Sequence, residues 1–495
     1  MKVTTAHFKA TARVELGNAR TQRFLQILPL RLSARRNAAY ASFADPAAAH
    51  AYGQAIRGEG VARLPELLET FEANARANGA RVFWAADSQA ANAYIVDLAR
   101  QKGVRYVTKG KSMITEELGL NEALAANGII PWETDLGEFI AQLLERPPFH
   151  IVGPAINIPV EEIRDIFIAR GVMATPTTDP VTLGRAARRF LRDKFRDLQM
   201  GITGVNIAVA ETGTVINVEN EGNIRFNKSS PRTLVCVMSL EKVVPGMADA
   251  LHMLRVLCRS ATGQAAGAYL SFDSGPQRQG EKDGPEELHI VILDNGRSAM
   301  VRDAHTREVL RCIRCGACLN ACPVYGKVGG YPYGWAYSGP MGQVLTPALR
   351  GLSDTGDLIR ACTLCHRCKT ICPAGIDHPA TLLYYRYKDV QMDPQFNGRG
   401  VSPLERLTYR AYGLIGSHPG LWRLLGRAAR RVANRHRRNG AIQRIARWTD
   451  GWFSSRDLPL LPRDTFHDRW RQRQAATAGP DKYASPDAAP RRRKG

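Results

Sequence analysis

Helical and strand-like patterns of hydrophobic residues alternate through residues 61–300. In LPELLETFEANARANG the apolar residues recur every three or four positions, as on one face of a helix, and Gly79 stands where that helix is expected to end. The strand-like segment RVFWAA follows directly, and the helix-like QAANAYIVDLARQKG then leads into the strand-like VRYVTKG. Strands joined through helices in this way predict a mostly parallel sheet that is covered on both faces.

Acidic residues mark two further helix starts in the same region. Asp135 and Glu138 have the spacing of a capping box ahead of LGEFIAQLLER, and Asp179 with Pro180 forms a good N-cap and first-turn pair for the next long helix. Between these two helices, FHIVGP is predicted to form a further strand.

The second half of this region has a different character. VNIAVAETGTVINVENEGNIRF alternates β-branched with small polar residues around Gly213, which predicts a β-hairpin or meander. TLVCVM is a further buried strand, PGMADALHMLRVLCR is a helix that opens with proline, and ELHIVILDNGRS is a strand that runs into a turn at 294–296. One α/β domain over residues 61–300 accounts for the whole pattern.

The segments on either side differ from this domain. Residues 1–60 mix apolar and basic residues without strand alternation and are predicted to form a helical N-terminal extension. Residues 301–385 hold most of the cysteines between helix-like flanks. Residues 386–495 form a basic C-terminal region rich in Pro, Trp and Arg, and its last ~20 residues are predicted to be disordered.

Charge and hydropathy narrow the class of protein. Residues 401–495 carry 21 of the 68 Lys and Arg but only 7 of the 46 Asp and Glu, so they hold +14 of the net charge of +22. A solvated basic face is the commonest cause of such a bias, so nucleic-acid binding is not expected, whereas contact with a membrane surface is left open.

No apolar run approaches the roughly 18 residues of a transmembrane segment, and the N-terminus lacks a secretory apolar block. These features predict a cytoplasmic protein, and a peripheral position on the inner face of the membrane is also left open.

Eight of the ten cysteines lie in two matching blocks. CIRCGACLNACP and CTLCHRCKTICP each space four cysteines as C-x2-C-x2-C-x3-C and follow the last with proline. This is the ligand pattern of a bacterial two-cluster ferredoxin, and it predicts two [4Fe–4S] clusters. The 40-residue step from Cys322 to Cys362, together with the helix-like flanks, favours the all-α kind of two-cluster module over the compact β kind.

The spacing also predicts which cysteines share a cluster. A tight C-x2-C-x2-C loop supplies three thiolates, and the fourth cysteine of each block binds the other cluster in two-cluster ferredoxins. One cluster is therefore assigned to Cys312, Cys315, Cys318 and Cys372, and the other to Cys362, Cys365, Cys368 and Cys322. Zinc is disfavoured because it would leave a third closely spaced cysteine unused in each block, and a substrate-binding open cluster because each set supplies four ligands.

The signals for other chemistry are weaker. Glu211, in the sequence ETGT, is the one candidate catalytic residue, and a polar hairpin tip is the competing interpretation. Polar residues just beyond it would extend this position into a phosphate, CoA or organic-acid site: Asn217, Glu219, Asn220, Glu221 and Asn223. KGKS at 109–112 lacks the spacing of a phosphate-binding loop, and no G-x-G-x-x-G follows a strand, so a nucleotide-dependent dehydrogenase is disfavoured. Cys236 and Cys258 stand alone among apolar residues and are predicted to be buried.

Several segments together resemble the lactate utilization protein B family, the iron–sulfur subunits of a bacterial L-lactate oxidation system. AETGTVINVENEGN, GPEELHIVILDNGRS, the two cysteine blocks and YGWAYSGPMGQVLTP between the blocks carry the resemblance, which covers essentially the full length. It implies an α/β domain similar to the NagB/ribose-5-phosphate isomerase/CoA-transferase superfamily. It also implies an α-helical ferredoxin module similar to that of succinate dehydrogenase iron–sulfur subunits.

The resemblance further implies a function and partners. The chain would relay single electrons through two [4Fe–4S] clusters during oxidation of L-lactate to pyruvate, as the electron-transfer subunit of a lactate-oxidising complex. A subunit with cysteine-rich CCG-type domains and a smaller subunit with the same α/β domain would be its partners. The alternative is a CoA- or sugar-phosphate-type catalytic α/β domain with structural or sensory clusters, in which Glu211 would be the residue to test.

Overall fold

The computed structural model describes residues 3–443, 445, 453, 456–462 and 464–477. The chain forms two compact units, one that ends at Gly400 and one that begins at Val401. Within the described residues, no helix is both long enough and apolar enough to cross a membrane. Most of the C-terminal segment that is predicted to be disordered lies outside the described residues, which end at 477.

Helices fill the N-terminal part of the first unit. They are η1 (Thr5–His7), α1 (Phe8–Gly17), α2 (Ala19–Ala41) and α3 (Pro46–Ala62). Asn18 caps α2 by accepting hydrogen bonds from the N–H groups of Arg20 and Thr21, and Asp45 caps α3 in the same way. Helix α2 then packs against the cysteine region, so the N-terminal helices belong to the body of the unit.

A six-stranded sheet forms the centre of the α/β domain. All of its neighbouring strands run parallel, in the order β1-β10-β7-β4-β2-β3. The strands are β1 (Arg81–Ala85), β2 (Tyr106–Lys109), β3 (Ile130–Glu133), β4 (Met200–Gly204), β7 (Thr233–Ser239) and β10 (Glu287–Leu293). The predicted parallel sheet is therefore confirmed, and the carboxyl ends of its strands lie along one edge.

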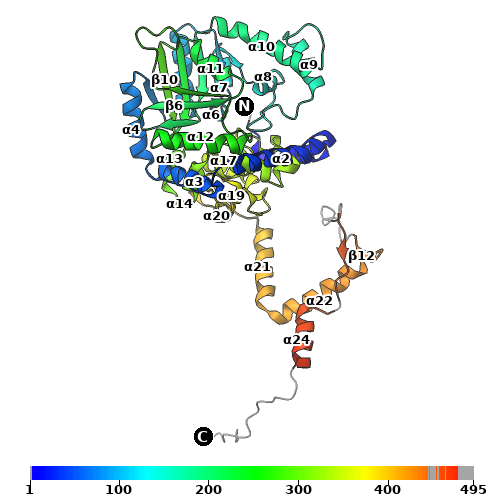
Figure 1. Ribbon diagram of the computed structural model, residues 1–495. Helices are drawn as coiled ribbons and strands as arrows, with labels where there is room; N and C mark the ends of the chain where they lie inside the picture. Colours follow the sequence, from blue (N-terminus) through cyan, green and yellow to red (C-terminus); the bar gives the residue numbers. More distant parts are fainter. Residues whose placement is uncertain (1–2, 444, 446–452, 454–455, 463, 478–495) are drawn as a thin grey trace, which may run out of the picture. The chain divides into compact units, whose positions relative to one another are not determined.

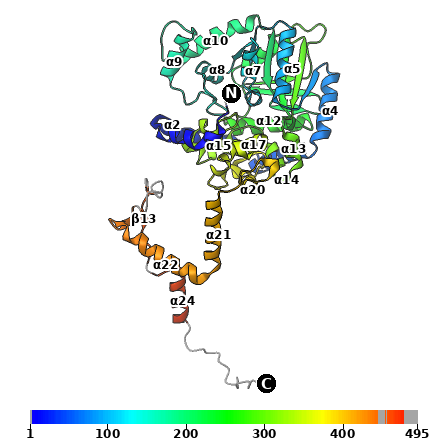
Figure 2. The ribbon, with the colours of Figure 1, turned by 180° about the vertical axis from the view of Figure 1, so that it is seen from behind.

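Both faces of this sheet are buried. Side chains of β7 alternate between two hydrophobic cores, with Cys236 in one and Val237 in the other, which explains why TLVCVM is apolar throughout. Helices cover one face: α5 (Ser88–Gln101), α6 (Met113–Leu118) and α7 (Leu120–Ala126). Helix α4 (Leu64–Ala77) and a second sheet cover the other face (Figures 1 and 2).

The predicted hairpin belongs to this second sheet, whose strand order is β8-β5-β6-β9. Strands β5 (Ile207–Val209) and β6 (Thr214–Glu219) pair antiparallel around Gly213, whose φ of +66° favours glycine. Strands β8 (Val243–Val244) and β9 (Tyr269–Asp273) complete the sheet. Helices α12 (Met247–Ala261) and α3 pack on its far face, so the second sheet is buried between two layers.

The prediction is wrong for the last part of the hairpin segment, because NIRF begins a helix, α11 (Asn223–Ser229). Gly222 turns the chain ahead of this helix with a φ of +73°. The carboxylate of Glu219 then accepts hydrogen bonds from the N–H groups of Ile224 and Arg225, at 2.7 and 2.8 Å. A side chain of β6 therefore supplies the helix start, which the alternating pattern could not reveal.

The strand predicted at FHIVGP is also wrong, because residues 149–154 form a loop. The Phe149 ring is fully buried, and its carbonyl accepts a hydrogen bond of 2.9 Å from the Tyr325 hydroxyl in the cysteine region. Contacts with the cysteine region therefore hold residues 149–154 in place, without pairing to a strand. The flanking helices α8 (Leu136–Leu143), α9 (Val160–Ala169) and α10 (Pro180–Arg196) share a hydrophobic core. Asp179 caps α10 as predicted, and Asp135 caps α8, but the Glu138 carboxylate does not complete the predicted capping box.

The cysteine region is a helical module without strands over residues 297–396, all of which are described. Figures 1 and 2 show α17 and α20 on the side of the sheets where α2 and α12 lie. The predicted all-α module is therefore confirmed. Its elements are α13 (Arg297–Arg302), α14 (Ala304–Arg307), η3 (Glu308–Arg311), α15 (Ala317–Ala321), α16 (Tyr325–Val328), η4 (Tyr331–Tyr333), α17 (Gly339–Arg350), α18 (Leu352–Thr355), η5 (Leu358–Arg360), α19 (Arg367–Ile371), α20 (His378–Val390) and η6 (Pro394–Phe396).

The second unit combines helices with a small sheet. Tyr412 and Trp422 pack edge to face across its first two helices, with ring centroids 6.1 Å apart. The Asn434 side chain exchanges hydrogen bonds of 2.9 and 3.1 Å with the backbone of Leu461. The elements are α21 (Pro403–Ser417), α22 (Pro419–Arg435), β11 (Arg437–Arg438), β12 (Ala441–Ile442), β13 (Leu458–Pro459) and α24 (Phe466–Thr477).

Candidate iron–sulfur centres and the adjoining cavity

The first cysteine block winds around a short helix. Cys312 follows η3, and Arg314 has a left-handed φ of +61°. Gly316, with a φ of +75°, is the N-cap of α15, which carries Cys318. Cys322 follows the last residue of that helix. The two left-handed residues let the loop turn tightly enough for its first three cysteines to face one region.

The second block repeats this path. Cys362 follows η5, and Leu364 has a left-handed φ of +55° at the position of Arg314. The exposed His366, with a φ of +61°, takes the N-cap position of α19 that Gly316 takes in α15. The repeated backbone conformation shows that the matching spacing of the two blocks has a matching structure.

The two blocks lie side by side, and α15 packs against α19. Cys312, Cys315 and Cys318 of the first block line one small cavity together with Cys372 of the second. On the other side, the pKa of Cys368 is raised to about 12, first by burial and then by the neighbouring Cys322, Cys362 and Cys365. The structure therefore brings the last cysteine of each block beside the first three cysteines of the other.

The environment of these thiols fits an iron–sulfur cluster. Backbone N–H groups donate hydrogen bonds to the sulfur of the first and last cysteine of each block, at 3.3 to 3.5 Å: Arg314 to Cys312, Tyr325 to Cys322, Leu364 to Cys362 and Ile376 to Cys372. Such donors stabilise negative charge on sulfur. Burial and then the neighbouring thiols also raise the pKa of Cys318, so four thiolates can coexist here only beside a cation such as iron.

The two sets differ in exposure. In the first set, Cys315 and Cys372 are each only 7% exposed. In the second set, Cys368 is equally buried, but Cys365 is exposed. The second set therefore reaches the protein surface, whereas every cysteine of the first set is buried or partly buried.

The aromatic segment between the blocks, YPYGWAY, has two interpretations from sequence: a docking surface and a packed loop. Tyr333 is fully buried and packs edge to face on Phe8, with ring centroids 5.4 Å apart. Tyr337 is also buried, and its hydroxyl donates to the Glu117 carboxylate at 2.5 Å. These two residues support the packed loop.

A buried chain of charges connects the α/β domain to the first cysteine block. Arg297 contacts Glu117 at 2.6 Å and Glu241 at 3.0 Å, and Glu241 also pairs with Arg314 at 2.7 Å. Burial alone would raise the pKa of Glu241, but the guanidinium groups of Arg297 and Arg314 lower it to about 2. Because Arg314 lies between the first two cysteines, this network fixes the block to the domain.

A cavity of about 320 Å³ lies beside this network, at the carboxyl ends of β2, β4 and β7. Open parallel sheets usually bind ligands at this edge. The polar residues singled out in the sequence all line it: Asn217, Glu219, Asn220, Glu221 and Asn223. Three cations in its wall were missed: Lys111, Lys242 and Arg314. Lys111 and Lys242 each follow a buried strand by two or three residues, which is the signal that could have found them.

Glu211 lies outside the lining of this cavity. It is exposed, and its Oε2 accepts a hydrogen bond of 2.9 Å from the N–H of Met247 at the first turn of α12. Through this contact, Glu211 helps to cap the N-terminus of α12. Its catalytic role stays a prediction.

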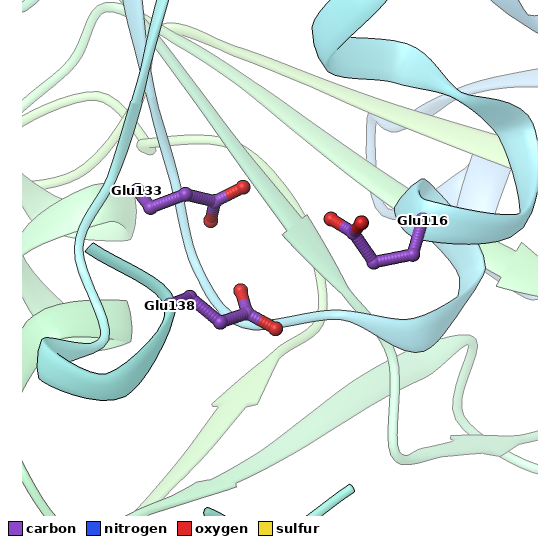
Figure 3. A group of neighbouring side chains, drawn as sticks. All are labelled: Glu116, Glu133 and Glu138. Carbon is purple, nitrogen blue, oxygen red and sulfur yellow. The ribbon is translucent and has the colours of Figure 1, made fainter. Parts of the chain in front are cut away.

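A second acidic group, formed by Glu116, Glu133 and Glu138, has its own counter-ion. Figure 3 shows the three carboxylates turned toward one another. The fully buried Lys109 ammonium lies 2.7 Å from Glu133 and 3.0 Å from Glu116, so it already supplies the cation that this group needs. Glu138 is 4% exposed, and neither of its carboxylate oxygens has a hydrogen-bond partner among the described residues. Burial and then the charge of Glu133 raise the pKa of Glu138 well above its ordinary value, which favours its protonated form.

Three family models match successive parts of the chain. The LUD domain matches residues 68–293, and the 4Fe-4S dicluster domain matches residues 308–376. The model described as lactate utilisation protein B, C-terminal, matches residues 388–475. The second match assigns the cysteine blocks to iron–sulfur binding, in agreement with the sulfur environment described above.

Curated relatives match nearly the whole chain. Lactate utilization protein B of Bacillus velezensis is 37% identical over 476 residues, which are 96% of this chain and 98% of the relative. The protein of the same name from Bacillus licheniformis is 37% identical over 484 residues, covering 97% and 100%. An uncharacterized electron transport protein of Escherichia coli, YkgF, is 38% identical over 421 residues, covering 85% and 87%. The chain therefore belongs to the lactate utilization protein B family.

Proposed function

We propose that this chain is the electron-carrying iron–sulfur subunit of a system that oxidises L-lactate to pyruvate. The observation that carries this proposal is the arrangement of the eight cysteines in two sets, each completed by the last cysteine of the other block. The names of the relatives, which refer to lactate utilization and electron transport, support the substrate and the role.

The first set, Cys312, Cys315, Cys318 and Cys372, would hold one [4Fe–4S] cluster, and Cys362, Cys365, Cys368 and Cys322 would hold the other. Such a cluster gains or loses one electron at a time, so two clusters suit the two electrons that L-lactate releases on becoming pyruvate. The chain itself shields the first set by burial and stabilises sulfur charge through backbone N–H donors. The exposed Cys365 marks the second set as the place where a partner exchanges electrons with the chain.

Two partners complete the proposed system. One carries cysteine-rich CCG-type domains, and the other is a smaller protein with the same α/β domain. We propose that this chain acts with them in the cytoplasm or on the inner face of the membrane.

Anaerobic purification followed by iron analysis and EPR spectroscopy tests the cluster count. We expect about eight irons per chain and the spectrum of two interacting reduced clusters. Four irons, or zinc in place of iron, would contradict the ligand assignment.

Growth on L-lactate tests the role. Cys312→Ser and Cys365→Ser should abolish growth, whereas Cys236→Ser, which changes a buried thiol outside both sets, should not. Glu211→Gln tests the alternative, in which the α/β domain is catalytic and Glu211 is its catalytic residue. If Glu211→Gln abolishes growth while the cluster-site variants retain it, the electron-carrying proposal fails.

A further inference from the structure

The cavity beside the first cysteine set is lined by both cations and carboxylates. Lys242 and Arg314 line it together with Ser239, the last residue of β7. Glu219 and Glu221, which follow from β6 toward the start of α11, also line it. A ligand that fits this lining needs an anionic group for the cations and a hydrogen-bond donor for the carboxylates.

Of the three cations in the cavity wall, Lys242 differs from the other two in its contacts. Lys111 pairs with Asp135 at 3.3 Å and donates to the Val152 carbonyl at 2.9 Å. Arg314 pairs with Glu241. Among the described residues, the partly exposed Lys242 ammonium has neither an ion pair nor a hydrogen bond, and partial burial followed by the charge of Arg314 lowers its pKa to about 7. An unpaired charge in such a place is costly, and an anion in the cavity would remove that cost.

Two other donors in the cavity wall are also unused. The Ser239 hydroxyl lines the cavity and makes no hydrogen bond to the described residues. Asn206 accepts a hydrogen bond from Val218 N through Oδ1, and its NH2 group donates to none of the described residues. An ammonium, a hydroxyl and an amide donor in the wall of one cavity suit the oxygens of a carboxylate.

A carboxylate in the same wall can accept a hydrogen bond from a hydroxyl group. Both oxygens of Glu219 accept backbone N–H donors from α11, so that carboxylate is already satisfied. Glu221 accepts one hydrogen bond, of 3.0 Å from Leu136 N to Oε2, and its other oxygen accepts none from the described residues. A hydroxyl donor on the ligand would complete Glu221.

We infer that this cavity binds a small hydroxycarboxylate, with its carboxylate at Lys242. That the acid is L-lactate rests on the proposed function. The site is adjacent to the first cysteine set, because Arg314 and Ile151 line both the cavity and the space between those cysteines. The cavity, the first cysteine set and the second cysteine set then follow one another in that order from the α/β domain to the protein surface.

Calorimetric titration of the full chain, with its clusters loaded, tests this site. L-Lactate should bind saturably to the native chain and to Lys282→Met, which changes an exposed lysine of the same domain. Lys242→Met should weaken binding at least about tenfold, because a charge-assisted hydrogen bond is lost. Ser239→Ala should weaken it by a smaller factor. Propionate, which lacks the hydroxyl, should bind more weakly than L-lactate.

A thermal denaturation of the ligand-free variants separates binding from structure. Removing an unpaired, partly desolvated charge should leave the melting temperature of Lys242→Met equal to or above that of the native chain, while the shift produced by L-lactate disappears. The inference is overturned if L-lactate does not bind the native chain, or binds Lys242→Met equally well. Because this assay measures binding and not electron transfer, it can fail while the cysteine variants still abolish growth, and the reverse result would instead overturn the proposed function.

Discussion

Glu241 joins two arginines inside the protein, and replacing it tests the buried charge network. Its side chain is fully buried between Arg297 and Arg314. The lowering of its pKa from an ordinary 4.5 to about 2 corresponds to about 3 kcal/mol of stability at neutral pH. Removing one partner of a buried ion pair costs about 3–5 kcal/mol in other proteins, so the two routes agree. We therefore expect Glu241→Gln to lower the free energy of unfolding by about 3 kcal/mol.

Urea denaturation followed by tryptophan fluorescence measures this difference. A carboxylate whose pKa is lowered on folding stabilises the protein above its unfolded pKa, and this contribution is lost as the pH falls from about 4.5 toward 2. The difference between native and variant should thus be constant from about pH 8 to pH 6. Glu66→Gln, which breaks an exposed pair with Arg63, serves as the control and should cause no resolvable change. A Glu241→Gln effect below about 1 kcal/mol would refute the reasoning, because it would mean that the network contributes no more than a surface pair.

Three further changes test other parts of the structure. Glu138→Gln should leave stability unchanged at low pH, because burial and Glu133 keep the native carboxyl protonated. A group whose pKa is raised on folding loses its contribution as the pH rises through the folded pKa, so the variant should become the more stable protein in thermal melts at alkaline pH. Cys236→Ser should lower the melting temperature but leave the iron content unchanged, because burial raises the pKa of this thiol to about 12 and keeps it neutral. Gly213→Ala should cost more than about 1 kcal/mol in urea denaturation, because φ is +66° and the added Cβ would overlap the backbone N of Ala75.

Features that depend on neighbours in sequence were predictable. The parallel sheet follows from helices and strands that alternate over short distances, and β7 and β10 lie where the apolar runs TLVCVM and ELHIVIL indicate. The failures are segments whose partners are remote. Residues 149–154 look like a strand but are held as a loop by Tyr325, which lies 176 residues away. NIRF looks like the end of a strand, but Glu219 caps it as a helix.

The cysteine spacing by itself determined that this protein binds iron–sulfur clusters, because three thiolates of a set come from one tight loop and its geometry is local. Only the tertiary structure decided what surrounds those loops. Arg297 reaches Glu117 across 180 residues, and Lys242 lines the cavity without an ion pair or hydrogen bond to any described residue. Packing fixes such contacts, and no local pattern encodes which distant charge a side chain will meet. The sequence thus carried the iron–sulfur assignment of the cysteine blocks, and the fold carried the cavity beside them.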